Sequence, residues 1–418
     1  MNTAITILIF LIFLGGIFFS IYLKMPQFKA FKALKSIKGT PSYHAFLVTL
    51  ATNIGTGNLV GVSSGIVVGG PGVIIWMWIF GFFSCSLSYL ENYYAVKYQT
   101  TIENEKRGGA CYYILKGLNC KTLSIIFAVF LLLTNTLFFP PLQVNTVVTA
   151  ISSYFEISKI LVGIVLFLLI VIVAFRGTKT IVKVTELFVP YMTIGFVLLT
   201  IILMCVNIKA LPIAVTKIFN SAFNIKSFGV GYIINSISTG FRRSLFSNEA
   251  GLGTTPSITG MSDGCPETQG YLQIIGVYVD TLLMCTLTGI FIVQMNINTG
   301  GVISSDMIIK VFDAGMGKIG AFFGFLFLSV FAFASVVGQF YLGESNALFF
   351  SEVTNIKPRT IVFLYKIIYA VGIIVGIITS TEAAISLLDI GMILLGTINL
   401  IAIIILEKKR KHLAKIID

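Results

Sequence analysis

Charged residues are scarce in this chain of 418 residues: only 11% are Asp, Glu, Lys or Arg, whereas 56% are hydrophobic. Soluble globular domains carry about 25% charged residues, so the sequence lacks the side chains needed to cover a water-exposed surface. Metal and redox motifs are scarce too, because the chain has two histidines and its six cysteines include no CxxC pair. The composition excludes secreted, disordered and disulfide-scaffold proteins, and it disfavours a zinc, redox or histidine-rich metal site.

Long apolar runs are what the sequence has in abundance, and its mean hydropathy is +0.95. A helix of about 20 apolar residues crosses the ~30 Å hydrocarbon core of a bilayer. We therefore expect an all-α polytopic membrane protein with eleven transmembrane helices. The predicted spans cover residues 4–23, 43–67, 72–96, 121–153, 157–175, 185–207, 228–247, 269–296, 318–350, 359–379 and 382–406.

The basic residues orient these spans. With the N-terminus outside, 22 of the 29 lysines and arginines fall in cytoplasmic segments and six fall outside. Cytoplasmic loops of membrane proteins are enriched in Lys and Arg, so the net charge of +12 reflects topology rather than a nucleic-acid partner. We predict a multi-pass protein of the plasma (inner) membrane with an external N-terminus and a cytoplasmic C-terminus.

The same spans divide the chain into four parts. Residues 1–42 would form an N-terminal helix and a basic cytoplasmic linker, and residues 407–418 a basic cytoplasmic tail. Between them, residues 43–207 and 208–406 would each supply five helices. Counted from residue 43, these are core helices one to ten.

Glycine and polar residues interrupt two of the core helices. The first contains the run Ala51–Gly61, and the sixth contains Asn235–Arg243 followed by Ser247–Gly253. Each has a Thr-Gly step, at Thr56-Gly57 and at Thr239-Gly240. Because transporters bind substrate where corresponding helices of two repeats unwind near the membrane midplane, the pattern predicts a binding site between these helices.

Further polar residues lie in the third and eighth core helices. They are Gln143 and Asn145 in the third, and Ser335 and Gln339 in the eighth. A buried glutamine needs a hydrogen-bond partner, and either a neighbouring helix or a ligand can supply it.

Carboxylates within the predicted spans are few. Glu91 and Glu344 lie near cytoplasmic helix ends, where pairing or gating is expected, whereas Asp280 and Asp389 lie deeper. For the two aspartates, structural pairing and carriage of a proton or ion both stay open.

At these residues the sequence resembles the alanine/glycine:cation symporter family. The resemblance covers roughly residues 30 to 405, and its motifs are Gly55–Val62, Gly69–Gly72, Trp76–Trp78, Gly108–Ile114, Gln143–Asn145, Leu245–Gly253, Val277–Leu282, Cys285–Thr288 and Tyr341–Glu344. It implies a leucine-transporter-type fold, in which ten core helices form a five-plus-five inverted repeat after one extra N-terminal helix. It also implies uptake of small neutral amino acids, chiefly alanine and glycine, coupled to sodium or proton entry by alternating access.

The resemblance implies a substrate site as well. The amides of Thr56 and Gly57 would bind the substrate carboxylate, and Asn58, Gln143 and the backbone around Gly240 would complete the pocket. Two positions depart from the family. Gln339 replaces a usual tryptophan, and Ser238-Thr239 replaces a usual arginine-tyrosine pair before Gly240. These changes imply a more polar and larger pocket, which suits serine or glutamine as well as alanine.

A sodium site is implied between the first and eighth core helices. Its ligands would be the carbonyls of Ala51, Ile54 and Phe331 and the hydroxyl of Ser335. Sodium is then the coupling ion, and no other cofactor and no obligatory protein partner is expected.

Three other functions compete with sodium symport: another kind of amino-acid transport, an ion channel and an enzyme. A proton-coupled or exchange-type amino-acid transporter is the nearest alternative, because one serine hydroxyl does not decide the ion. An ion channel would show pore loops or rings of charge, and an enzyme would need catalytic or metal-binding groups within the spans. Neither His44 nor His412 has such partners in its predicted span or loop.

Overall fold

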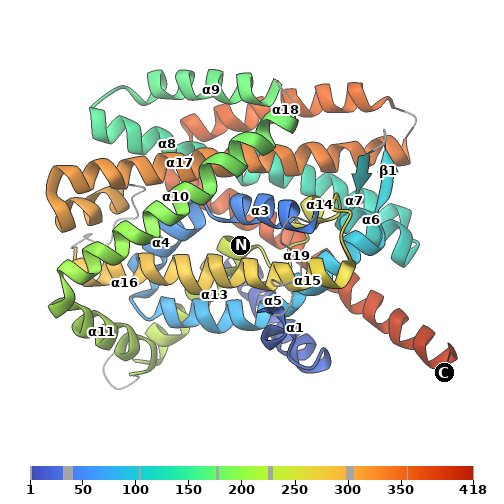
Figure 1. The fold of residues 1–418 in the computed structure, drawn as a ribbon, viewed down its shortest axis with the longest axis horizontal. Helices are drawn as coiled ribbons and strands as arrows, with labels where there is room; N and C mark the ends of the chain where they lie inside the picture. Colours follow the sequence, from blue (N-terminus) through green and yellow to red (C-terminus); the bar gives the residue numbers. More distant parts are fainter. Residues whose placement is uncertain are drawn as a thin grey trace.

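The computed structural model describes residues 2–31, 41–102, 105–175, 178–224, 229–297, 306–354 and 356–417. These residues form an almost entirely helical protein, in which a single two-stranded antiparallel hairpin is the only sheet of the described part (Figure 1).

The elements of the first half follow the predicted apolar runs. Their bounds are α1 Asn2–Tyr22, α3 Pro41–Asn53, η2 Gly57–Gly61, α4 Val62–Gly69, α5 Val73–Lys97, β1 Thr100–Ile102, β2 Glu105–Arg107, α6 Ala110–Tyr112, η3 Tyr113–Gly117, α7 Lys121–Leu133, η4 Thr134–Phe138, α8 Pro140–Phe155, α9 Lys159–Phe175 and α10 Thr178–Val206.

The second half continues in the same way. Its bounds are α11 Leu211–Phe223, α13 Val230–Asn248, α14 Pro256–Thr259, α15 Pro266–Val277, η6 Tyr278–Cys285, α16 Thr286–Met295, α17 Met307–Val353, α18 Pro358–Ile378 and α19 Thr381–Ile417. The elements η2, η3, η4 and η6 are π-helical turns within or beside these helices.

Seven of the described helical stretches are long and apolar enough to cross a membrane, and a bent pair would make eight. The pair consists of Pro190–Val206 and Ile208–Phe223, whose axes differ by 82°. Each of the eleven predicted spans overlaps described helical residues, although residue 228, the first of one span, lies outside the described ranges. The count of eleven therefore stays a prediction, whereas several apolar crossings are evident.

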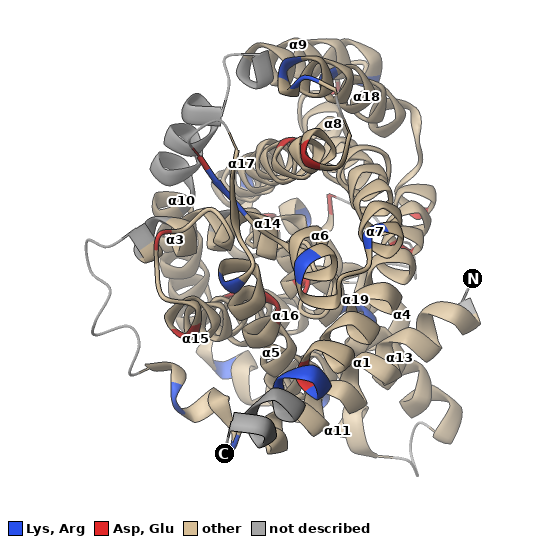
Figure 2. Ribbon diagram, turned by 90° about the vertical axis from the view of Figure 1, so that its right-hand side faces the viewer, with Lys and Arg blue, Asp and Glu red and all other residues tan. Residues whose placement is uncertain are grey.

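The outer surface is apolar where a soluble protein would be polar. On α9 the side chain of Ile160 is 68% exposed, and on α18 that of Phe363 is 57% exposed, with similar aliphatic neighbours along both helices. Charged residues are sparse over the ribbon (Figure 2). Large contiguous apolar surfaces mark contact with a membrane or partner, and together with the long apolar helices they indicate a multi-pass membrane protein.

Two helices organise the packing. Helix α5 packs against α1, α13 and α15, whereas α17 packs against α8, α10 and α18. In Figure 1 the first group lies in the lower part of the molecule and the second group in the upper part. The short segments around η2 contact both groups, through α13 and through α17, so the interrupted first core helix lies between them.

The structure adds two features to the predicted pattern. Residues 211–223, which lie between two predicted spans, form helix α11, which begins with Pro212 in its first turn and buries Ala214, Ile218 and Ala222. Helix α17 begins at Met307, before the predicted span, and is kinked at Met316 and Gly317, where Gly317 has a φ of 64°. A positive φ suits glycine, which has no Cβ.

Candidate functional site

The first core helix is interrupted where the glycine cluster predicted. Helix α3 ends at Asn53 and helical structure resumes with η2 at Gly57. The side-chain oxygen of Asn58 accepts a hydrogen bond of 2.9 Å from the Gly55 N–H, and the Asn58 N–H donates to the Gly55 carbonyl at 3.2 Å. Asn58 thus stabilises the opened turn by taking up backbone groups that the interruption leaves without helical partners.

The sixth core helix is interrupted within the second run of its predicted polar cluster. The helix passes through the first run, which contains Thr239-Gly240, and α13 continues without interruption to Asn248. The chain then takes positive φ angles at Glu249, Gly251 and Gly253. The unwound segment therefore lies in the Ser247–Gly253 motif.

Gly240 has a packing role in this structure. A Cβ atom built on it would lie 2.5 Å from the Trp76 Cβ and 2.9 Å from the Val73 carbonyl oxygen of α5. Small residues at helix contacts let two backbones approach closely. Hence the backbone around Gly240 faces α5, and its predicted part in the substrate pocket gains no support from the geometry.

The two interruptions lie side by side. A Cβ atom on Gly57 would lie 3.0 Å from the Cα of Ser247, and one on Gly61 would lie 3.2 Å from the ring of Phe246. Across this contact the side-chain amide nitrogen of Asn58 donates a hydrogen bond of 3.2 Å to the Ser247 hydroxyl. The end of α13 and the start of η2 therefore form one polar centre from segments 189 positions apart in the chain.

A buried carboxylate completes this centre. Asp280, in the π-helical turn η6, is fully buried. Its oxygens accept hydrogen bonds from Asn58 at 2.7 Å, Ser247 at 2.7 Å and Thr281 at 3.0 Å. Within the described ranges no lysine or arginine forms an ion pair with it, so three neutral donors surround the carboxylate.

Asp389 differs from Asp280. Arg242 of α13 donates a hydrogen bond of 2.7 Å to the Asp389 side chain, and a second guanidinium nitrogen forms an ion pair with it. Of the two possibilities that the sequence left open, Asp389 has a structural partner, and Asp280 has polar surroundings suited to a cation or proton.

The predicted substrate residues meet near the first interruption. The hydroxyl of Thr56 donates to the side-chain oxygen of Gln143, and both residues are buried. Gly338 packs against Thr52, so the eighth core helix touches α3 one residue before its end. The next residue, Gln339, is only 3% exposed, and its side-chain oxygen has no hydrogen-bond partner among the described atoms.

The predicted sodium ligands come from the same two helices. A Cβ atom built on Gly55 would overlap the Ser335 hydroxyl oxygen and would lie 3.7 Å from the Phe331 carbonyl oxygen. Ile54 directly precedes Gly55, and Ala51 lies in the last turn of α3. The chain thus brings the segments that carry all four predicted ligands together.

Some residues that shape the site were not singled out as ligands from the sequence. Glu91 of α5 accepts a hydrogen bond of 3.1 Å from the Gly253 N–H, and Asn399 of α19 donates to the Gly251 carbonyl at 3.0 Å. Asn399 also donates to Glu91. These side chains satisfy the backbone of the unwound segment after α13, which gives Glu91 the pairing role expected of it.

Comparison with known proteins identifies the family of this chain. A model of the sodium:alanine symporter family matches residues 1–416. The amino-acid carrier protein AlsT of Bacillus subtilis (strain 168) is 33% identical over 413 residues, covering 96% of this chain and 87% of the relative. The probable sodium/glutamine symporter GlnT of the same organism is 30% identical over 414 residues, covering 96% and 86%.

A solved structure shares the fold. The substrate-bound, outward-open state of a Na⁺-coupled sialic acid symporter aligns with a TM-score of 0.51 at 13% identity, covering 92% of this chain and 82% of that one. The family model, which matches residues 1–416, and the relative AlsT show that this protein is a transporter, not an enzyme, and that it belongs to the sodium:alanine symporter family.

Proposed function

We propose that the protein takes up a small neutral amino acid together with sodium by alternating access. In this proposal eleven helices cross the membrane, and ten of them form a leucine-transporter-type five-plus-five inverted repeat after α1. The observation that carries the proposal is the contact between two helix interruptions, Gly57 against Ser247, beside the approach of Gly55 to Ser335. Unwound helices that meet in this way expose backbone groups for a substrate and an ion.

The substrate site would lie on the α17 side of the first interruption. The amides of Thr56 and Gly57 begin a helical segment, and such N–H groups bind carboxylates well. Asn58 and Gln143 would shape the pocket, whereas Gly240 stays a weaker candidate because it faces α5. The unpaired oxygen of buried Gln339 supports a polar ligand there, since buried polar atoms normally have partners.

The chemical class of substrate follows from these groups. Backbone amides suit the carboxylate that every α-amino acid carries, and the Gln339 side chain suits a hydroxyl or amide on a small substrate. The family description names alanine, and one relative is a probable glutamine symporter. We infer a range that includes alanine and glycine and extends to serine or glutamine.

Sodium would bind between α3 and α17. The Ser335 hydroxyl and the carbonyls of Phe331, Ala51 and Ile54 are hard oxygen donors without a formal charge. Such ligands suit a monovalent cation that must also be released. The overlap of a Gly55 Cβ with the Ser335 hydroxyl supports this placement, because only glycine leaves room beside it.

Uptake by reconstituted liposomes tests the proposal. Radiolabelled alanine, glycine, serine and glutamine are offered with an inward sodium gradient, with no gradient, and with an inward proton gradient. Accumulation that requires the sodium gradient is expected for at least one of the four. Uptake driven by acid outside and indifferent to sodium would overturn sodium coupling, and uptake of none would overturn the substrate class.

The Asp280 centre favours proton coupling as a second candidate function. A buried carboxylate without a cationic partner is costly unless it binds a proton or a cation. Asp280→Asn keeps the size of the side chain and removes its charge. If Asp280 carries a coupling proton or cation, the variant should bind substrate but lose gradient-driven accumulation, which parallel binding and uptake assays would measure.

A further inference from the structure

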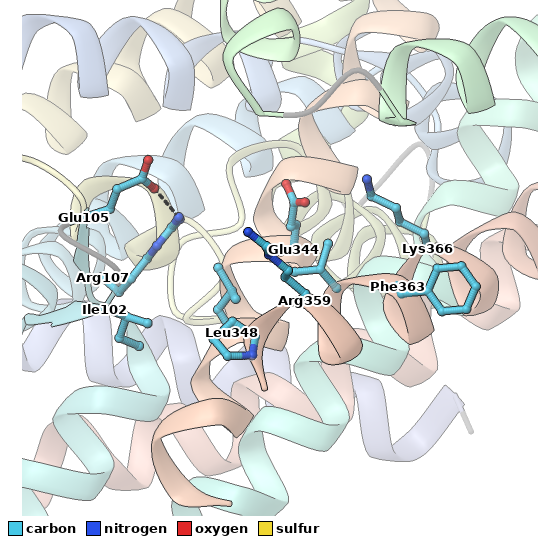
Figure 3. A pocket seen from close by; sticks show the side chains of 10 residues that line it. Ile102, Glu105, Arg107, Glu344, Leu348, Arg359, Phe363 and Lys366 are labelled. Atoms are coloured by element: carbon cyan, nitrogen blue, oxygen red, sulfur yellow. Dashed lines mark hydrogen bonds and ion pairs between the residues drawn. The ribbon is translucent and has the colours of Figure 1, made fainter. Parts of the chain in front are cut away.

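A cavity lies away from the helix interruptions, where the β1–β2 hairpin approaches the ends of α17 and α18. Its volume is about 460 Å³. It is lined by Ile102, Glu105, Arg107, Glu344, Leu348, Pro358, Arg359, Val362, Phe363 and Lys366. Figure 3 shows the Glu105–Arg107 pair on one side and Lys366 and Phe363 on the other, with Glu344 and Arg359 between them.

One face of α18 supplies the cationic wall. Arg359, Val362, Phe363 and Lys366 have the i, i+3, i+4, i+7 spacing of a single helix face. Arg359 lies in the first turn, which contains no acidic residue, and Lys366 lies about 10 Å further along the axis at 1.5 Å per residue. The exposed N–H groups of the first turn add partial positive charge to this end of the cavity.

Arg107 supplies the opposite wall from within the protein. It is 6% exposed and forms an ion pair of 2.5 Å with Glu105, whose own side chain is 60% exposed. The Arg107 Nε atom is buried and has no hydrogen-bond partner in the described part of the chain. Three basic residues, Arg107, Arg359 and Lys366, and two carboxylates, Glu105 and Glu344, thus line the cavity.

The cavity lies at the edge of the apolar surface. Phe363 lines it and is itself largely exposed, and Leu364 and Ile367 continue the exposed apolar face of α18. Helix α18 is long and apolar enough to span a membrane from its first residue, Pro358. A ligand in this cavity would therefore touch both water and the outer, apolar side of the helix.

We propose that this cavity binds the headgroup of an anionic phospholipid. The phosphate would lie between Arg359 and Lys366, with Arg107 on the opposite wall, the acyl chains would follow the exposed face of α18, and headgroup hydroxyls would donate to Glu344. Clusters of Lys and Arg at the ends of membrane helices attract anionic lipids at about 1 kcal/mol per cation. A soluble phosphate would use the same cations but would gain nothing from the apolar wall.

Lipid retention by the purified full-length protein tests the proposal. The protein is equilibrated with phosphatidylglycerol or phosphatidylcholine in detergent, and the bound lipid is measured by native mass spectrometry. Wild type should retain phosphatidylglycerol in preference to phosphatidylcholine. Arg359→Gln with Lys366→Gln should weaken the affinity for phosphatidylglycerol roughly 30-fold. Glu105→Gln, which removes an exposed carboxylate beside Arg107, should strengthen it.

A matched control separates the cavity from general surface charge. Lys121 and Lys408 are exposed and do not line the cavity, so Lys121→Gln with Lys408→Gln changes the net charge equally and should leave retention unchanged. Equal loss in both double variants, or equal retention of phosphatidylcholine by wild type, would overturn the proposal. Displacement of the lipid by millimolar inorganic phosphate would show a site for soluble anions instead. Because Glu105→Gln predicts the opposite sign, a folding defect cannot imitate the full pattern.

Discussion

Ser335 lies against Gly55 where the first core helix is interrupted. Removing one atom from the Ser335 side chain therefore tests the proposed sodium site. Ser335→Ala removes the hydroxyl proposed to bind sodium and leaves the helix packing nearly unchanged. Interactions with a charged group contribute about 1.5–3 kcal/mol. The sodium concentration for half-maximal uptake should therefore rise about tenfold or more, while protein abundance should hardly change.

The control for this variant is Ser345→Ala. Ser345 lies on the same helix and is buried, but its hydroxyl donates to the Ser257 carbonyl at 3.5 Å rather than facing Gly55. It should leave the sodium dependence as in wild type. If Ser335→Ala also leaves the sodium dependence unaltered, the sodium site has been placed wrongly.

Gln339 offers a second test at the same scale, because its side-chain oxygen is buried without a partner. Gln339→Trp should close the pocket over a methyl-sized substrate and remove a hydrogen-bonding group worth about 0.5–1.5 kcal/mol. Preference should shift about threefold to tenfold toward alanine and glycine and away from serine and glutamine. Competition assays on wild type and variant measure this ranking. An unchanged order would mean that Gln339 faces only protein.

The unwound segment after α13 follows directly on the polar centre of the candidate site. Side chains from α5 and α19 stabilise this segment. Asn399→Leu leaves the Gly251 carbonyl and Glu91 without their shared donor. Loss of a partner for a buried polar group costs about 1–3 kcal/mol. We expect a lower melting temperature and faster protease cleavage within residues 249–255, together with reduced uptake.

Asn346→Leu is the matched substitution for this experiment. Asn346 is also buried and donates to a backbone carbonyl, that of Ala128 at 2.9 Å, and it accepts a hydrogen bond from the Cys111 thiol, so these hydrogen bonds go to α7 and α6 rather than to the unwound segment. A similar loss of stability without the local cleavage is expected. Equal cleavage at residues 249–255 in both variants would contradict the stabilising role of Asn399.

At the scale of the whole molecule, the prediction to test is the membrane topology. An odd number of crossings places the termini on opposite sides, and the distribution of Lys and Arg places the N-terminus outside. A tag before Met1 should be labelled on intact cells by an impermeant reagent, and a tag after Asp418 should be labelled only after permeabilisation. Two tags on the same side would rule out eleven crossings.

Much of the architecture was predictable because a membrane imposes simple rules. Apolar runs of sufficient length must be helical, since hydrocarbon offers no partners to backbone N–H and C=O groups. The predicted spans therefore coincide with described helices such as α5 and α18. The interruption at residues 54–56 was predictable for a similar reason, because glycines flanked by Thr56 and Asn58 disfavour a continuous helix and supply local hydrogen bonds.

The location of the second interruption depended on tertiary structure. A glycine within a helix can either loosen it or let another helix approach, and the sequence around Gly240 is compatible with both. Contact with Trp76 and Val73 made Gly240 a packing residue. The chain opened in the second run of the predicted cluster, at Glu249–Gly253, where Glu91 and Asn399 take up the freed backbone groups.

Asp280 and Asp389 likewise show which features the sequence predicts and which features tertiary packing decides. Their positions in the sequence establish only that each is buried in an apolar span and therefore needs a partner. Three-dimensional packing gave Asp389 an arginine from α13 and gave Asp280 only neutral donors from η2, α13 and η6. The sequence by itself determined the membrane class, the helices and the first interruption, because these depend on local composition. The tertiary structure decided which buried polar groups have partners and which do not, because those contacts join residues far apart in the chain.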